Sequence, residues 1–218
     1  MTTATDTSAT VREPALLGQT VLVIGGSAGI GLATAHLVHA EGAHVVLTGR
    51  DPQRLERVAA ELGARGHDAF DAHDPRSLDE FFRSLTAPVD HVMVTAGGPY
   101  YAPLADMDVA DACRYLAAHV GLTLQVARCA AQIVRPGGTL LFMGGTGARK
   151  PAVGISITAL LTAGVPALIA NLALELAPIR VNLIAAGFVD TPSRPRCLAT
   201  TLMRAASNCV PRSRSDGW

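Results

Sequence analysis

A cluster of glycines between an apolar run and a helical segment is the feature that most limits the fold of this chain. The apolar run covers Thr20–Ile24, and Gly25-Gly26-Ser27-Ala28-Gly29-Ile30-Gly31 follows it at once. Glycine permits a tight turn, lets the backbone approach a diphosphate and lets the helix pack on the strand. The helix N-terminus then offers free N–H groups to an anion. This pattern predicts a nucleotide-binding turn; the alternative is a tight turn with a structural role only.

Short β-rich apolar runs alternate along the chain with longer segments of helical period. This alternation is typical of a parallel sheet with helices on both faces, the doubly wound (Rossmann) α/β fold, in which ligands bind at the carboxyl ends of the strands. The predicted strands are residues 20–24, 44–48, 68–71, 89–94, 139–143 and 181–184. The predicted helices are residues 30–41, 52–64, 77–85, 109–134 and 155–176.

Size and charge indicate one domain with a small-molecule ligand. The chain has 218 residues, is 49% hydrophobic and carries 18 basic and 18 acidic side chains. Because these charges are interspersed, we expect no surface for nucleic acid or for an anionic membrane. Residues 1–16 lack the basic start and apolar run of a signal peptide, so we interpret them as a flexible leader before a domain at 17–192. We therefore expect a cytoplasmic protein.

Residues 151–174 contain no charged side chain, and such a stretch is long enough to cross a bilayer. Its hydroxyl and amide side chains, its glycines and Pro166 argue against a membrane span, as does its place between predicted strands. We interpret it as a helix buried against the sheet or at a contact between subunits.

Two polar residues at strand ends bear on the choice of cofactor. Arg50 follows the second predicted strand, where an acidic residue would favour NAD(H) by binding a ribose hydroxyl and an arginine suits a 2′-phosphate. Arg50 therefore predicts NADP(H) in preference to NAD(H); the alternative is a solvated arginine. Asp71, placed at the end of the third predicted strand, is a candidate acceptor for the adenine amino group, or else a loop carboxylate.

Further motifs follow in order along the chain. Thr95-Ala96-Gly97 comes after the fourth predicted strand, and residues 180–182 and 187–192 read Arg-Val-Asn and Gly-Phe-Val-Asp-Thr-Pro. With the glycine turn they resemble the short-chain dehydrogenase/reductase family, from about Leu17 to Pro192. The resemblance implies an oxidoreductase, with subunit contacts through the uncharged outer faces of the fourth and fifth helices. The residues that it places around the cofactor, together with the glycines of the turn, are Gly25, Ser27, Gly29, Ile30, Gly31, Arg50, Asp71, Ala96, Gly97 and Thr191.

The chain departs from the family at its catalytic positions. Active members use a tyrosine as general acid/base, a lysine four residues later, an upstream serine and an asparagine on the fourth helix. Alignment on the end of the fifth predicted helix puts the tyrosine position at Thr158 and the lysine position at Thr162. The serine position falls on Gly145 and the asparagine position on His119.

No Tyr-x-x-x-Lys motif can exist, because Lys150 is the only lysine and Tyr115 the last tyrosine. A threonine hydroxyl is too weak an acid to replace tyrosine, and loss of a general acid costs ~10²–10⁴ in rate. Candidate replacements are Tyr100 and Tyr101, His119 and Lys150. The alternatives are that these tyrosines line a pocket, that the histidine is a satisfied helix residue and that the lysine is a solvated charge.

No metal site is predicted. His36 and His39 share a helix face without a third ligand, and the four cysteines lack C-x-x-C spacing.

Residues 193–218 are rich in Arg, Ser, Cys and Pro and lack a clear period, whereas the family continues with helices over the substrate and a last strand. Back-translation shifted by one base gives a segment that looks like the family's, so we hypothesise an out-of-frame tail, which gene sequencing would test. Without the seventh strand the sheet keeps an unpaired edge, and the nicotinamide site is open to water.

Two functions stay open at this point. The first is an NADP(H)-dependent oxidoreductase that acts on a small carbonyl or alcohol with a nonstandard or impaired proton relay. The second is a catalytically degenerate nucleotide-binding protein that senses the cofactor or pairs with an active relative.

Overall fold

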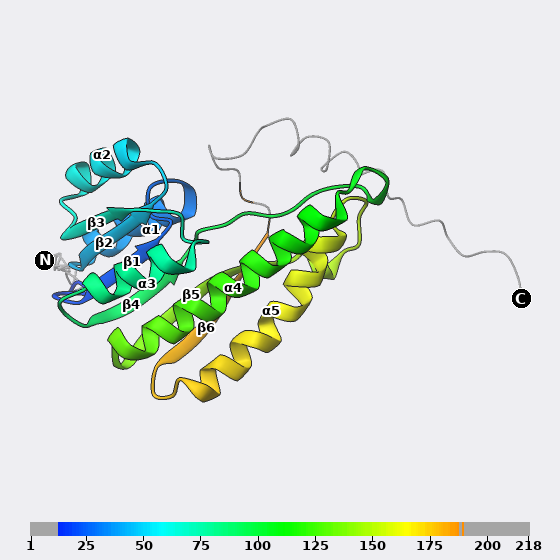
Figure 1. The fold of residues 1–218 in the computed structure, drawn as a ribbon. Helices are drawn as coiled ribbons and strands as arrows, with labels where there is room; N and C mark the ends of the chain where they lie inside the picture. The colour runs from blue at the N-terminus through cyan, green and yellow to red at the C-terminus, as the bar shows by residue number, and fades with distance from the viewer. Residues whose placement is uncertain (1–12, 188, 190–218) are drawn as a thin grey trace, which may run out of the picture.

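Six parallel strands form one sheet in the order β3-β2-β1-β4-β5-β6 (Figure 1). The computed structural model describes residues 13–187 and 189. The strands are β1 (Thr20–Ile24), β2 (His44–Gly49), β3 (Gly66–Ala69), β4 (Val89–Val94), β5 (Val134–Gly145) and β6 (Arg180–Ala186). Reversal of the strand order beside β1 makes the β1/β4 boundary the switch point at which ligands of this fold bind.

Five helices cover the two faces of the sheet. They are α1 (Gly29–Ala40), α2 (Pro52–Leu62), α3 (Pro75–Ser84), α4 (Val109–Ile133) and α5 (Ser156–Glu175), with short 3₁₀ turns η1 (Leu104–Asp106) and η2 (Gly147–Arg149). A hydrophobic core lies on each face of the sheet, and alternate side chains of β1 belong to one or the other. Leu22 and Ile24 pack with α3, α4 and α5, whereas Val21 and Val23 pack with α1 and α2. The predicted doubly wound fold is confirmed.

Short polar residues begin three of the helices. The Asp51 carboxylate accepts a hydrogen bond of 3.0 Å from the Arg54 N–H at the start of α2, and Pro52 is the first helical residue, where its missing N–H costs nothing. Asp74 caps α3 and Asp108 caps α4 in the same way. These caps fix the points at which the chain leaves the carboxyl edge of the sheet and turns back over it.

The third strand lies two residues earlier than predicted. It pairs with β2 from Gly66 to Ala69, and the Phe70 N–H then donates to the Gly49 carbonyl as the chain leaves the sheet. Asp71 therefore lies in the turn after the strand, where its carboxylate accepts a hydrogen bond of 3.1 Å from the His73 N–H. Aspartate favours turns because its carboxylate can accept a hydrogen bond from a main-chain N–H two residues later. This preference outweighs the pattern that predicts Asp71 at the end of the strand.

The fifth strand is longer than predicted, because it begins directly at the end of α4. The helix ends at Ile133, and the Arg-Pro-Gly-Gly stretch at residues 135–138, which disfavours helix, already belongs to β5. Val134 pairs with Val89, and an irregular register follows before Thr139 pairs with His91.

Helix α5 is the one described helix that is long and apolar enough to cross a membrane by length and composition. Of its most apolar 18-residue stretch, 22% is buried in the structure. In the structure it packs along the sheet beside α4 (Figure 1), and it runs without a break through Pro166. Its buried side chains, which join the core formed with β4, β5 and β6, are Leu161, Val165, Ile169 and Leu172. The predicted packing of this helix against the sheet is confirmed.

Candidate functional site

Only glycine fits at two positions of the turn after β1. A Cβ atom on Gly25 would lie 2.7 Å from the Ala96 nitrogen, and a Cβ on Gly31 would lie 2.3 Å from the Gly25 carbonyl oxygen. Gly25 also has a φ of +92°, which side chains disfavour. The turn, the start of α1 and the end of β4 are therefore in close backbone contact.

The N-terminus of α1 has no side-chain partner. Its N-cap residue, Ala28, makes no capping hydrogen bond, and no acidic residue lies in the first turn. The first N–H groups of a helix lack intrahelical acceptors and carry the positive end of the dipole. This end of α1 is therefore suited to a bound anion such as a diphosphate.

The end of β2 lies beside the glycine turn. A Cβ on Gly49 would lie 2.7 Å from the Ser27 Oγ, so these two residues are packed together and Arg50 follows directly. Arg50 is exposed and forms no ion pair with any other residue that the structure describes. The geometry leaves its guanidinium available to a ligand phosphate.

Asp71 lies within electrostatic reach of Arg50. The hydrogen bond from the His73 backbone N–H lowers the pKa of the Asp71 carboxyl, and the His73 ring and the Arg50 charge add to this effect. Asp71 is thus ionised at neutral pH and presents carboxylate oxygens at the same edge as Arg50. A carboxylate at this edge can accept a hydrogen bond from a ligand.

The end of β4 completes this edge. The Thr95 and Ala96 N–H groups both donate to the Ile24 carbonyl, at 2.8 and 3.1 Å, and Gly97 follows with a φ of +104°. The structure thus brings together nine of the ten predicted cofactor residues: Gly25, Ser27, Gly29, Ile30, Gly31, Arg50, Asp71, Ala96 and Gly97. The tenth, Thr191, lies outside the described residues, as do residues 193–218 and the first twelve residues of the predicted leader.

Three of the four predicted relay positions also lie close together. A Cβ on Gly145, at the end of β5, would be 3.0 Å from the Thr162 Cγ2. A Cβ on Gly147 would be 3.4 Å from both Thr158 Cγ2 and Thr162 Oγ1. The positions assigned by counting along α5, Thr158 and Thr162, therefore lie beside Gly145. These three residues provide two hydroxyl groups and no ionisable side chain.

Both threonine hydroxyls are engaged in hydrogen bonds to the main chain. Thr158 Oγ1 donates to the Tyr100 carbonyl at 2.6 Å. Thr162 Oγ1 accepts from the Ala148 N–H at 2.8 Å and donates to the Ala159 carbonyl at 3.2 Å. Each hydroxyl proton is used within the fold, so neither threonine replaces a proton donor.

The nearby tyrosines are also held by carbonyl groups. Tyr115 Oη donates to the Gly98 carbonyl, and burial followed by the charge of Tyr101 raises the pKa of Tyr115 to about 12. Tyr100 Oη donates to the Asp108 carbonyl at 3.4 Å, and its ring centroid lies 5.4 Å from that of Tyr115. Such a raised pKa disfavours proton sharing at neutral pH.

The fourth relay position is His119 on α4, beside Tyr115 and Gly97. Its ring centroid is 6.0 Å from that of Tyr115, whose own ring packs against Tyr100. Burial, and then the charge of His73, lower the pKa of His119, so its imidazole is neutral at pH 7. Lys150 is an exposed residue at the end of η2.

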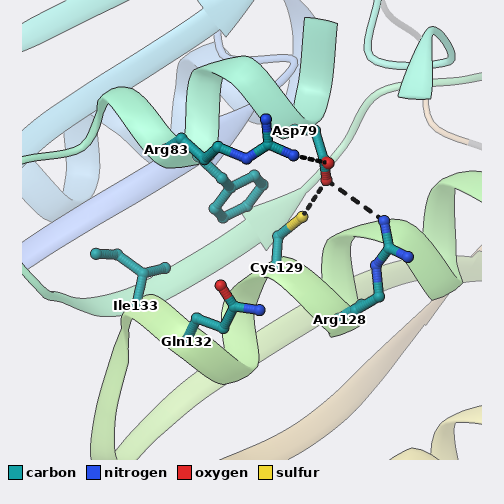
Figure 2. Close-up of a pocket in the computed structure, with 7 residues that line it drawn as sticks. Asp79, Arg83, Arg128, Cys129, Gln132 and Ile133 are labelled. Carbon is teal, nitrogen blue, oxygen red and sulfur yellow. Dashed lines mark hydrogen bonds and ion pairs between the residues drawn. The ribbon is translucent and has the colours of Figure 1, made fainter. Parts of the chain in front are cut away.

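A cavity of about 480 Å³ lies elsewhere, between the last turns of α3 and α4 (Figure 2). Its residues are Asp79, Phe82, Arg83, Arg128, Cys129, Gln132 and Ile133. Because α3 ends at the amino-terminal edge of the sheet, this cavity is at the opposite edge from the glycine turn. The sequence does not predict this cavity, because its lining residues come from two helices that lie about 50 positions apart in the chain.

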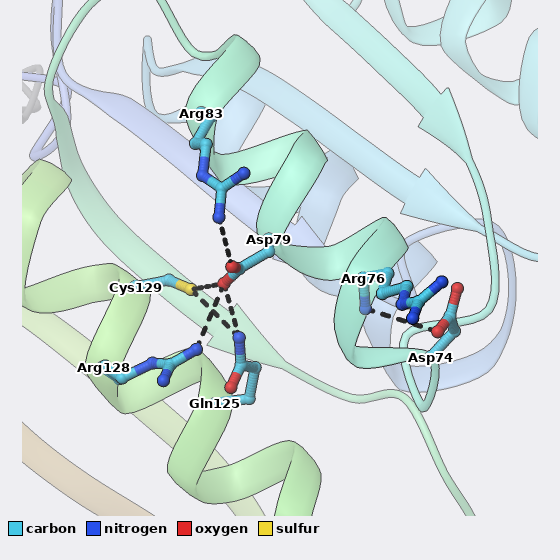
Figure 3. Close-up of polar contacts among 7 residues, drawn as sticks. All are labelled: Asp74, Arg76, Asp79, Arg83, Gln125, Arg128 and Cys129. Carbon is cyan, nitrogen blue, oxygen red and sulfur yellow. Dashed lines mark hydrogen bonds and ion pairs between the residues drawn. The ribbon is translucent and has the colours of Figure 1, made fainter.

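Asp79 is the centre of the polar contacts beside that cavity (Figure 3). Its carboxylate accepts hydrogen bonds from Arg83 at 2.6 Å, from Arg128 at 3.5 Å and from Cys129 at 3.3 Å, and another from Gln125. The Cys129 thiol is the main cause of the lowered pKa of Asp79, while burial and Asp79 raise the pKa of Cys129 to about 11. The contacts with Gln125, Arg128 and Cys129 join α3 to α4.

Residues 13–187 contain no group of three or more His, Cys, Asp or Glu side chains placed to hold a metal ion.

Comparison with known proteins bears on this geometry. The family model described as enoyl-(acyl carrier protein) reductase matches residues 25–215. The chain belongs to the short-chain dehydrogenase/reductase family. The match runs into the segment after residue 192, beyond the end of the likeness seen in the sequence motifs. The out-of-frame reading of that segment stays a hypothesis.

Curated relatives cover most of the chain. The short-chain dehydrogenase/reductase ATR9 of Stachybotrys chlorohalonatus is 29% identical over 189 residues, which cover 80% of this chain and 75% of that protein. The dehydrogenase/reductase SDR family member 4 of Sus scrofa is 30% identical over 83% of this chain and 69% of its own length. Both are dehydrogenase/reductases by name.

Solved structures share the fold. A dehydrogenase/reductase from Sinorhizobium meliloti 1021 has a TM-score of 0.77 at 30% identity and covers 84% of this chain and 77% of its own. BdcA, solved in complex with NADPH, has a TM-score of 0.75 at 27% identity and covers 83% of this chain and 75% of its own. This short-chain dehydrogenase/reductase thus has the sheet and helices of known nucleotide-binding relatives.

Proposed function

We propose that this protein is an NADP(H)-dependent oxidoreductase that acts on a small carbonyl or alcohol with an impaired proton relay. The observation that carries the proposal is the close-packed turn of Gly25 and Gly31 in front of an uncapped α1. A Cβ atom at either position would overlap main chain, so the backbone has room for a diphosphate only because these residues are glycines.

Arg50 supports the preference for NADP(H). A guanidinium that has no ion pair within the described part of the chain, one residue beyond β2, suits a 2′-phosphate by charge and geometry. Asp71 would accept from the adenine amino group, and Ala96 with Gly97 would border the ribose. The NADPH complex of BdcA, a relative by fold, agrees with this choice.

When bound, the reduced nicotinamide supplies a hydride to a carbonyl carbon, and a proton must reach the carbonyl oxygen. The residues at the tyrosine and lysine positions offer none, because Thr158 and Thr162 donate their hydroxyl protons to main-chain carbonyls. Proton transfer then depends on water, and we expect turnover ~10²–10⁴ below that of an enzyme with an intact general acid.

The assay is NADPH oxidation by purified protein with a panel of small ketones and aldehydes, followed by absorbance. Slow turnover above the protein-free background supports the proposal. Tight NADPH binding without turnover for any substrate contradicts the catalytic part and favours the second function.

The second function is a catalytically degenerate nucleotide-binding protein that senses cofactor or pairs with an active relative. The observation that favours it is the structural use of both threonine hydroxyls together with glycine at Gly145. Binding of NADPH with a large change in thermal stability, but with no product from any substrate, would distinguish this function.

We further propose that the protein is cytoplasmic and forms a homo-oligomer through α4 and α5. Leu124 on α4 and Leu160 on α5 are 46% and 58% exposed, and the two helices lie side by side. Light scattering after size exclusion, on wild type and on L124K, tests the contact; a monomeric wild type would contradict it.

A further inference from the structure

His119 carries an unexplained polar atom. Its Nδ1 is buried and has no hydrogen-bond partner among the described residues. A buried polar atom without a partner destabilises the folded state, so proteins rarely keep one without a reason. A ligand that supplies the missing hydrogen bond is one such reason.

His73 presents a second ring nitrogen to the same place. Its Nδ1 lies 3.3 Å from Asp71 Oδ1, and since an ionised carboxylate can only accept, we assign the hydrogen to Nδ1. The Nε2 of a neutral His73 ring is then a hydrogen-bond acceptor. The His73 side chain is 29% exposed.

Gly97 lies between the two rings. The point at which a Cβ atom would stand on Gly97 is 3.7 Å from His73 Nε2 and 4.0 Å from His119 Nδ1. Gly97 has a φ of +104° and no side chain, and the atoms nearest to that point belong to the two imidazole rings. A small polar group placed there could contact both nitrogens.

We propose that His73 Nε2 and His119 Nδ1 together bind one ribose hydroxyl of the nucleotide. A hydroxyl both donates and accepts, so it can donate to His73 Nε2 and accept from a hydrogen on His119 Nδ1. The inference rests on the proposed function, because Gly97 borders the ribose there. The lowered pKa of His119 keeps that ring neutral at pH 7, as the assignment needs.

Two substitutions at each position separate hydrogen bonding from shape. H119L removes the polar atom, whereas H119N returns one near the position of Nδ1. H73L and H73Q form the matching pair for Nε2. H36L, at an exposed position on α1, is the control for loss of a histidine. Thermal unfolding confirms that each variant is folded before it is titrated.

The probes are NADPH and its two halves, 2′,5′-ADP and NMNH, titrated by calorimetry. We expect H119L and H73L each to weaken NADPH binding about three- to tenfold, the loss of one hydrogen bond, with recovery in H119N and H73Q. A loss confined to 2′,5′-ADP assigns the adenosine ribose, and a loss confined to NMNH assigns the nicotinamide ribose.

Unchanged affinities of both leucine variants for every probe would overturn the inference while leaving the proposed function intact. A loss that H119N and H73Q do not restore would also overturn it, because shape alone would then explain the effect. A wild-type protein that binds none of the probes would fail the proposed function itself, and the variants are not needed to recognise that result.

Discussion

The Thr158 hydroxyl donates a hydrogen bond of 2.6 Å to the main-chain carbonyl of Tyr100. This bond joins the first turn of α5 to the segment after β4, and it uses the one proton that the hydroxyl has. If Thr158 acted as the general acid, its hydrogen bond to the Tyr100 carbonyl would have to break in every catalytic cycle. The position where the family keeps its tyrosine therefore has a structural role in this chain.

Restoring the relay should increase turnover. The double variant T158Y/T162K returns a tyrosine and the lysine four residues later, and we expect a rise of ~10²–10⁴ in the rate of NADPH oxidation with a reactive ketone. T162K alone, without the acid, is the matched control and should stay near the wild-type rate. Equal rates for wild type and the double variant would mean that a working proton donor exists elsewhere.

The G31A substitution should abolish nucleotide binding. Its Cβ would lie 2.3 Å from the Gly25 carbonyl oxygen, so the turn must move, and we expect a loss of about 1–3 kcal/mol in the free energy of unfolding. G121A, on α4 with no atom within 4 Å of the new methyl group, should keep or slightly raise stability. Full NADPH affinity in G31A would refute the role assigned to this turn.

Acid should destabilise the fold through His119. Its pKa in the folded protein is lowered from the ordinary 6.5, so the unfolded chain binds more protons just below that pH. The free energy of unfolding should therefore fall as the pH drops from about 6.5 toward 5. Urea unfolding at pH 7.5 and 5.5 measures this, and H119N should show a smaller drop than wild type or H36N. The same drop in all three would assign the acid sensitivity to other groups, of which His91, whose pKa is also lowered by burial, is the first to test.

Asp79 should matter to the contact between α3 and α4 more than an exposed ion pair does. D79N removes the negative charge that Arg83 and Arg128 share, and we expect it to lower the free energy of unfolding more than loss of an exposed ion pair does. The Cys129 thiol should then ionise at lower pH and be alkylated faster at pH 9, because Asp79 helps to raise its pKa. D111N, in the exposed pair with Arg114, should cost less than about 0.5 kcal/mol. Equal losses in the two variants would contradict the special place of Asp79.

The elements that sequence could predict are those with strong local signals. The bounds of β1 and β4 match the prediction at both ends, and Asp51 with Pro52 marks the start of α2. The weak strand β3 was misplaced because two of its four residues, Gly66 and Asp68, are poor strand formers whose pairing with β2 depends on tertiary contact.

The site divides in the same way. The placement of the glycine turn and of Arg50 at the carboxyl edge of the sheet could be predicted, because it depends only on chain position next to a strand. The hydrogen bonds of the Thr158 and Thr162 hydroxyls could not be predicted. Their partners Tyr100 and Ala148 come from loops whose course no local sequence pattern determines. The approach of His73 to His119 across Gly97 is likewise a product of three segments that meet only in the fold.

Titration with NADPH and NADH, repeated on R50A, is the most direct measurement of the central claim that the turn after β1 and Arg50 hold a phosphorylated dinucleotide. We expect wild type to prefer NADPH by about ten- to a hundredfold, the equivalent of one charge-assisted contact, and R50A to lose that preference while still binding NADH. R54A, an exposed arginine on α2, should behave as wild type. A wild-type protein that binds neither dinucleotide, or an R50A variant that keeps the full preference for NADPH, would contradict the account.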